Sequence, residues 1–402
     1  MTSLILLLLA VDLSYGSGTL QLQRLASVPD AALAQQVVAC TRGYGVTTLE
    51  RKGEPSAVVW SKADPATDAL PGTSRAERVA LLSILGRKMV GAEVDVLVPQ
   101  ADGTRVPVTV TWEPDGVVSF ESGPPVKSLL DETMTAEKIR AQFDVGEFID
   151  LDAPWDGRAY SVVHQALSLL SKEELALLRG MPFRRAKKEG IHRAKYERGD
   201  ATNCVFVYDA TFLFADELFT GSAQAPRAEA VAVLTHEFGH ALADVRFREK
   251  GLISKAAAEE YKRRQPEVDA AAKAFNDKVA ELGPKPTARG TAELKALEAA
   301  FAKVKAETDT RFKEADRLVK QMFANDRLNA QAGRPAEKAL AAVLNLKQSP
   351  TTYGRSSVRE HFAECFNIFK NDPAALRRIS AAAADWFAAG THISVAGQAI
   401  DP

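Results

Sequence analysis

The stretch Val231–Asp244 constrains this chain more than any other part of its sequence. It reads V-A-V-L-T-H-E-F-G-H-A-L-A-D and contains the pattern H-E-x-x-H, formed by His236, Glu237 and His240. An α-helix turns about 100° per residue, so residues four apart lie on one face, roughly one turn from each other. Both imidazoles can therefore point at one metal ion, with Glu237 beside them as a candidate base for a metal-bound water.

The residues around this pattern predict a buried helix. Apolar side chains surround it, and no proline interrupts it. Gly239 lowers helix propensity by about 1 kcal/mol relative to alanine, which suggests that another backbone or the metal shell comes close to it. H-E-x-x-H also occurs by chance in helices that bind nothing, so the prediction of a metal site requires a third ligand.

Composition excludes some classes of function. The chain has 402 residues, enough for two or three domains, and its 46% hydrophobic and 26% charged residues are typical of a globular protein. A net charge of −1 argues against a nucleic-acid partner and a polybasic membrane surface. Cys40, Cys204 and Cys365 are far apart and form no C-x-x-C, so we expect buried thiols rather than disulfides or zinc–thiolate ligands.

The apolar segment Leu4–Val11 has two interpretations. It is too short to span a bilayer as a helix, so we expect no integral membrane segment. As a signal-peptide centre it lacks a preceding Lys or Arg and a following A-x-A site, and Asp12 ends it early. A buried strand explains the same residues. We therefore slightly favour a cytoplasmic location, with secretion as the alternative if residues 1–18 act as a signal peptide.

The N-terminal part of the chain predicts a separate α+β domain. Ala76–Val90 has the apolar spacing of a helix, with Ser74 as a candidate N-cap. Glu93–Pro99 and Arg105–Trp112 alternate apolar and polar residues around A-D-G-T, which predicts a hairpin, and Val117–Phe120 adds a third strand. No motif in this part indicates chemistry.

Asp150–Gly157 (D-L-D-A-P-W-D-G) has the composition of a domain boundary. After it, Val162–Arg179 has the pattern of an amphipathic helix. The basic run Arg184–Lys188 is short and isolated, which favours a solvated face over a binding patch. Cys204–Phe214 is dense in β-branched and aromatic residues and predicts a strand. An edge strand at this point could bind an extended substrate.

A long charged segment, about residues 252–346, predicts a helical hairpin inserted after the motif. Apolar residues recur at coiled-coil spacing as far as Met322, although Thr308 and Arg311 weaken this seam. Gly283–Pro286 (G-P-K-P) breaks the pattern and separates the two arms. We favour an insertion that packs on the body of the protein over a partner-binding arm.

Thr351–Phe369 offers the third ligand. Glu360 and Glu364 are four apart and share a helical face, in a segment with a phenylalanine stripe. Two carboxylates on a partly buried face are unfavourable unless a positive group pairs with them. A zinc ion and its histidines would supply that group, with Glu360 as ligand and Glu364 accepting a hydrogen bond from a ligand histidine. The alternative is an exposed pair of acids. His361 points about 100° away from Glu360, so we do not expect it to be a ligand.

Together these two blocks resemble a known family. H-E-F-G-H-A followed by Asp244, and then Y-G-R-S-x-x-x-E-x-F-A-E-x-F, are similar to the catalytic domain of anthrax lethal factor and its relatives, which are gluzincin zinc endopeptidases. The second block is the more specific, because Tyr, Arg and two Glu recur at matching spacing. The resemblance does not extend to the N-terminal domain.

The resemblance implies a zincin-like fold, with helices around a small sheet, and zinc-dependent hydrolysis of a polypeptide. It implies His236, His240 and Glu360 as the ligands of one catalytic Zn²⁺. Three protein ligands leave a position for water. Glu237 would be the general base and acid.

Three further residues match supporting positions of the family. Tyr353 would stabilise the developing oxyanion or protonate the leaving group, Glu364 would orient a ligand histidine, and Asp244 would have a similar supporting role. The long helical insertion occupies an interval that is much shorter in lethal factor, so the resemblance concerns the metal site and not the shape of the substrate groove. The toxin's receptor-docking domain has no counterpart in this sequence.

We therefore predict an α+β protein with an N-terminal α+β domain at residues 1–150 and a zincin-like metallopeptidase domain at 155–402. Two alternatives remain. An aminopeptidase with the same zinc site would need an acidic anchor for the substrate amine, and no such motif is evident. A non-catalytic binding protein would retain the fold with an idle site, although all the predicted catalytic groups are present.

Overall fold

The chain folds into an α+β structure with two separate main hydrophobic cores. The computed structural model describes residues 18–51, 58–59, 73–87, 90–187, 194–197, 204–208, 218–284, 287–332 and 334–396. The strand predicted at Leu4–Val11 lies outside the described residues. Among the helices that are described, none is both long enough and apolar enough to cross a membrane.

The first core lies against a five-stranded sheet with the order β2-β1-β5-β4-β3. Strand β1 runs parallel to β5, and the other neighbours are antiparallel. The predicted helix and the three predicted strands are confirmed. The elements of this part are α2 (Gly18–Ala26), α3 (Asp30–Gly43), β1 (Thr48–Arg51), β2 (Val58–Val59), α4 (Arg75–Arg87), β3 (Ala92–Pro99), β4 (Arg105–Trp112) and β5 (Val117–Ser122).

Side-chain alternation explains the register of this sheet. Val96 of β3 lies opposite Val108 of β4, and both are buried in the first core, as expected when every second residue faces the same side. Ser74 caps α4 as predicted: its hydroxyl accepts a hydrogen bond from the amide of Glu77 (3.2 Å), and the Glu77 carboxylate accepts one from the amide of Ser74 (2.6 Å).

The second core surrounds a four-stranded sheet with the order β6-β7-β9-β8. Ile139 and Phe143 are buried in it together with Phe238 of the H-E-x-x-H helix. Residues before the expected boundary at Asp150–Gly157 therefore pack with the segment that carries the motif. The elements are α5 (Ala136–Phe143), β6 (Phe148–Asp150), α6 (Gly157–Ser168), α7 (Lys172–Leu178), β7 (Phe183–Ala186), β8 (Ala194–Glu197), β9 (Cys204–Tyr208), α8 (Glu229–Ala243), α11 (Pro335–Val343), η4 (Leu346–Gln348), η5 (Gly354–Ser356), α12 (Val358–Asn371), α13 (Pro373–Ile379), α14 (Ala381–Ala388) and α15 (Thr391–Ala396).

Two local predictions for this part are wrong, and a third, the solvated basic run, fails at Arg185 although Lys187 is exposed. Val162–Arg179 does not form a single helix, because Ser171 starts a second one through a capping box with Glu174. Arg185 of the basic run is only 5% exposed, and its Nη1 donates a hydrogen bond to the carbonyl of Val207 (3.3 Å), so it does not lie on a solvated face. Strand β9 lies between β7 and β8, so its described residues form an interior strand and not an edge.

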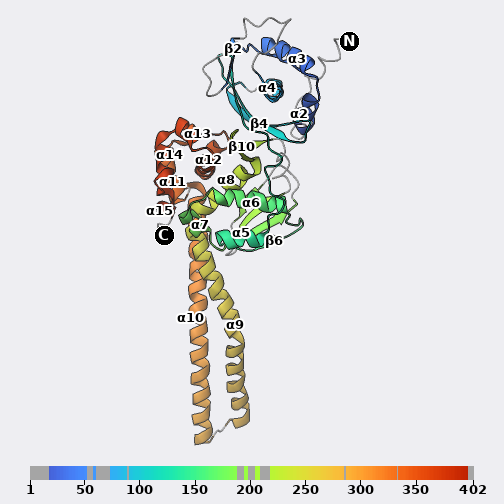
Figure 1. Cartoon of the computed structure of the whole chain (residues 1–402). Coiled ribbons are helices and arrows are strands. Elements are labelled where there is room, and N and C mark those ends of the chain that lie inside the picture. The colour runs from blue at the N-terminus through green and yellow to red at the C-terminus, as the bar shows by residue number, and fades with distance from the viewer. Residues whose placement is uncertain are drawn as a thin grey trace.

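The insertion is a pair of long helices, α9 (Val245–Leu282) and α10 (Ala288–Ala332), which pack on each other and extend away from the rest of the chain (Figure 1). The predicted hairpin is confirmed, and Gly283, directly after the last residue of α9, has a positive φ (62°). Ion pairs between the arms include one from Lys278 to Glu293 (2.9 Å). The arms project from the body, in contrast to the expected packing on it.

A short hairpin, β10 (Phe219–Ser222) and β11 (Ala225–Ala228), links the two parts of the chain. Leu218, just before β10, forms a bridge with Val96 of β3. Gly123 leaves no room for a side chain, because a Cβ there would lie 1.6 Å from the carbonyl oxygen of Ala223. Since β11 leads directly into α8, the H-E-x-x-H helix starts from a segment that is anchored to the N-terminal sheet.

Glu174 of α7 is a buried acid that joins three helices. Its side chain is 1% exposed, accepts a hydrogen bond from His392 Nε2 of α15 (2.7 Å) and lies 2.6 Å from Lys370 Nζ of α12. Burial alone would raise the pKa of Glu174, but the hydrogen bond from His392 and the positive charge of Lys370 outweigh it, so the pKa lies below its usual value.

We expect Glu174→Gln to lower the free energy of unfolding by about 3 kcal/mol at neutral pH, because Lys370 stays buried without its counter-charge. The folded state depresses the pKa of Glu174, so its stabilisation is complete above the unfolded value of about 4.3 and is lost as the pH falls through the folded value. Denaturant titrations at about pH 7 and pH 3 measure both effects. Glu173→Gln, at the exposed neighbouring position, is the control, and equal losses in the two variants would contradict this role.

Candidate metal centre

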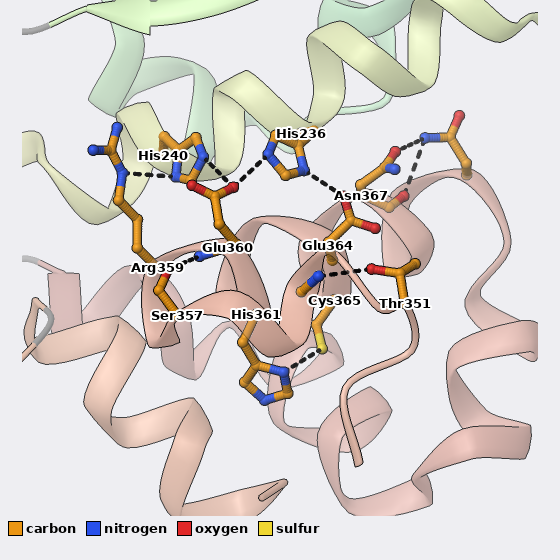
Figure 2. Close-up of polar contacts among 12 residues, drawn as sticks. His236, His240, Thr351, Ser357, Arg359, Glu360, His361, Glu364, Cys365 and Asn367 are labelled. Carbon is orange, nitrogen blue, oxygen red and sulfur yellow. Dashed lines mark hydrogen bonds and ion pairs between the residues drawn. The ribbon is translucent and has the colours of Figure 1, made fainter. Parts of the chain in front are cut away.

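Two helices bring the predicted ligands together. Helix α8 carries His236 and His240, which are 8% and 5% exposed, and α12 carries Glu360. The Nε2 atoms of His236 and His240 lie 3.1 and 3.2 Å from the same oxygen, Glu360 Oε2 (Figure 2). Ligand atoms of the three residues all lie within 4.8 Å of one another, close enough to hold one metal ion.

Gly239 allows the two helices to approach each other. A Cβ at this position would lie 3.0 Å from Cα of Ala363 and 3.3 Å from the ring of Phe366, both on α12. The close approach expected at this glycine is confirmed, and the neighbour is the backbone of α12. A larger residue would push α12 away and carry Glu360 with it.

Glu360 is held at the start of α12. The Ser357 hydroxyl caps the helix by accepting a hydrogen bond from the Glu360 amide (3.1 Å). The partial positive charge of a helix N-terminus also favours a carboxylate in the first turn. Phe362 and Phe366 are fully buried and fix the helix on the second core, as the predicted stripe required.

Glu364 contacts the other nitrogen of His236. His236 Nδ1 lies 2.8 Å from Glu364 Oε1, as the sequence predicted for a carboxylate that supports a ligand histidine. A proton on Nδ1 that is donated to Glu364 leaves the lone pair of Nε2 for a metal. The contact with Glu364 therefore favours the tautomer of His236 that is protonated at Nδ1 and can bind a metal through Nε2.

The charges of the cluster compensate one another. Burial would lower the pKa of His236, but its hydrogen bonds with Glu360 and Glu364 outweigh this and raise the pKa to about 10. Burial likewise opposes ionisation of Glu360, yet the hydrogen bonds from His236 and His240 hold its pKa well below the usual range. A metal cation between His236, His240 and Glu360 would take the place of the proton that His236 holds. The two imidazole nitrogens and the carboxylate oxygen are ligand atoms that suit such an ion.

His240 and Asp244 have contacts that the sequence did not reveal. Arg359 Nε lies 3.3 Å from His240 Nδ1. The Asp244 carboxylate accepts a hydrogen bond from Arg334 Nε (2.5 Å) in a buried ion pair. Arg334 follows α10, so this pair closes the root of the helical hairpin one turn from His240. Arg334 lies outside both motif blocks and Arg359 stands at an unspecified position of the second, so only the tertiary structure identifies their roles.

Tyr353 and Glu237 line the accessible side of the cluster. Tyr353 precedes η5, is 59% exposed, and its ring centroid lies 5.9 Å from that of His236. Burial, followed by the negative charge of Glu360, raises the pKa of Tyr353 to about 12, so its hydroxyl stays protonated at neutral pH. Glu237 is partly exposed, and its charge acts on both His236 and Tyr353.

His361 does not take part in the cluster, as predicted. It is fully buried, its Nε2 lies 2.9 Å from the carbonyl oxygen of Leu344, and it points away from the two ligand histidines (Figure 2). Cys365 lies beside it at 3.8 Å, and both Cys365 and Cys40 are buried free thiols, which agrees with the prediction for these two cysteines.

Comparison of the chain with protein-family models, with curated proteins and with solved structures finds no match. The function of this centre is therefore inferred from its own residues.

We expect Glu360→Ala to reduce the metal content of the purified protein from about one ion per chain to a small fraction of that, because one of three ligands is lost. Glu364→Gln should weaken metal affinity about 10- to 100-fold, since it alters only the support of His236. Elemental analysis and competition with a chelator measure the two effects. Glu298→Gln on the exposed surface of α10 is the control. Metal retained equally by Glu360→Ala would exclude Glu360 as a ligand.

Proposed function

We propose that the protein is a zinc metalloendopeptidase whose catalytic part has a zincin-like fold. The observation that supports this most strongly is the convergence of His236 and His240 on Glu360, with Glu237 on the same helix beside them. A set of two histidines and one glutamate is typical of catalytic zinc sites that cleave peptides. The contact between Glu364 and His236 supports the same assignment.

In this proposal His236, His240 and Glu360 hold the metal. Bound Zn²⁺ supplies Lewis acidity, which acidifies water and polarises the scissile carbonyl. Glu237 takes a proton from the attacking water and delivers it to the departing amine. Tyr353 remains protonated at neutral pH and donates a hydrogen bond to the carbonyl oxygen as negative charge develops there.

Strand β8 is the candidate binding edge for an extended substrate. It is the last strand in the order β6-β7-β9-β8, and it contacts α8, which carries the histidines. An exposed strand edge binds an extended peptide by adding it to the sheet, with affinity from main-chain hydrogen bonds. In this proposal β8, and not the predicted strand Cys204–Phe214, is the edge that binds the substrate.

A diverse library of peptides with blocked ends tests the proposal. We expect the zinc-loaded protein to cut internal bonds, and Glu237→Gln to lose at least about 1,000-fold in kcat while it retains zinc, because the general base is lost. Tyr353→Phe should lower kcat about 100-fold without loss of metal.

Mass spectrometry of the products locates the cuts. Cleavage that persists in Glu237→Gln would come from a contaminant. Removal of single residues from free N-termini alone would indicate an aminopeptidase, and no cleavage by a folded, zinc-loaded protein would support a binding role.

A further inference from the structure

Arg227 lies at the end of the site where β11 enters α8. It pairs across the hairpin with Thr220 of β10, and its Nη1 lies 3.2 Å from the point where a Cβ of Gly221 would stand. The carbonyl oxygen of Asn371, the last residue of α12, lies 4.0 Å from the same point. The guanidinium therefore lies on the face of the hairpin that meets the end of α12.

Among the residues that the structure describes, no carboxylate balances the charge of Arg227. The structure gives Arg227 no ion pair with any described residue, and partial burial lowers its pKa. The buried guanidinium of Arg334, in contrast, pairs with Asp244. Removing a cation from water is unfavourable unless an anion replaces the lost hydration. An anionic ligand would therefore lower the free energy of the partly buried guanidinium of Arg227.

A row of polar residues on α12 leads from the metal centre to Arg227. Glu360, Glu364, Asn367 and Asn371 share one face of the helix, at intervals of three and four residues. All four are partly exposed, and Asn371 Nδ2 donates hydrogen bonds to the backbone carbonyl and the side chain of Asn367. Figure 2 shows Asn367 beside Glu364 and His236. A peptide bound along this face of α12 would contact the side-chain amides of Asn367 and Asn371 after the metal site, and then Arg227.

We propose that Arg227 binds an acidic side chain of the polypeptide substrate and so determines its specificity. Guanidinium groups pair with carboxylates through two parallel hydrogen bonds, which gives geometric selectivity as well as affinity. Ala228, the N-cap of α8 and the neighbour of Arg227, lies eight residues before His236, which is about 12 Å along the helix at 1.5 Å per residue. An extended peptide rises about 3.3 Å per residue, so the acidic residue lies about three or four positions from the scissile bond. The inference rests on the proposed peptidase function.

Cleavage of a peptide library in which each position carries Glu, Gln or Lys tests the inference. Wild type should favour Glu at one position, about three or four residues from the cut. Arg227→Gln should raise KM for these peptides about 10- to 100-fold with little change in kcat, because a charged hydrogen bond is lost from substrate binding alone. Arg227→Glu should shift the preference at that position to Lys. Arg289→Gln, on the exposed tip of α10, is the matched control.

Binding of the same peptides to zinc-loaded Glu237→Gln protein separates this inference from the proposed function. Peptides with Glu that bind Glu237→Gln, but not Glu237→Gln/Arg227→Gln, establish the carboxylate site even if wild type cuts nothing. Cleavage with no preference for Glu, unchanged by Arg227→Gln, overturns the carboxylate site and leaves the peptidase intact. Neither cleavage nor Arg227-dependent binding overturns both.

Discussion

The packing of α8 on α12 at Gly239 is the contact on which the rest of the site depends. The backbone of Ala363 comes so close that even a Cβ at position 239 would be crowded at 3.0 Å. This approach places the nitrogens of His236 and His240 on a single oxygen of Glu360. Aromatic packing of Phe362 and Phe366 in the second core keeps α12 in this position. The cluster that could hold a metal ion is thus a consequence of helix packing, since α8 and α12 supply all three of its residues.

Buried charge pairs connect the centre to the rest of the fold. Glu174 joins α7, α12 and α15, and the pair of Asp244 with Arg334 closes the root of the helical hairpin just after α8. Since breaking such a pair strands a buried charge, these contacts resist local opening more strongly than exposed ion pairs would. The long arms α9 and α10 therefore start from a root that the Asp244–Arg334 pair fixes to the end of α8, the helix that carries the two histidines.

Local sequence rules predicted the parts of the structure that depend on helical and strand periodicity. The four-residue spacing of His236 with His240, and of Glu360 with Glu364, placed each pair on one face before the structure showed the two faces opposite each other. The same rules could not find Arg334 or Arg359, because their partners are distant in sequence. The burial of Arg185 was missed because only the neighbouring strand, through Val207, makes a buried guanidinium acceptable.

X-ray absorption spectroscopy of the zinc-loaded protein tests whether His236, His240 and Glu360 bind the metal, because it reports the atoms bound to it. We expect imidazole scattering from two histidines at about 2.0–2.1 Å with oxygen as the remaining ligand, and no sulfur. Replacing His240 by Ala should remove one imidazole contribution. Sulfur scattering at about 2.3 Å, or a shell without imidazole, would contradict a metal centre built from His236, His240 and Glu360.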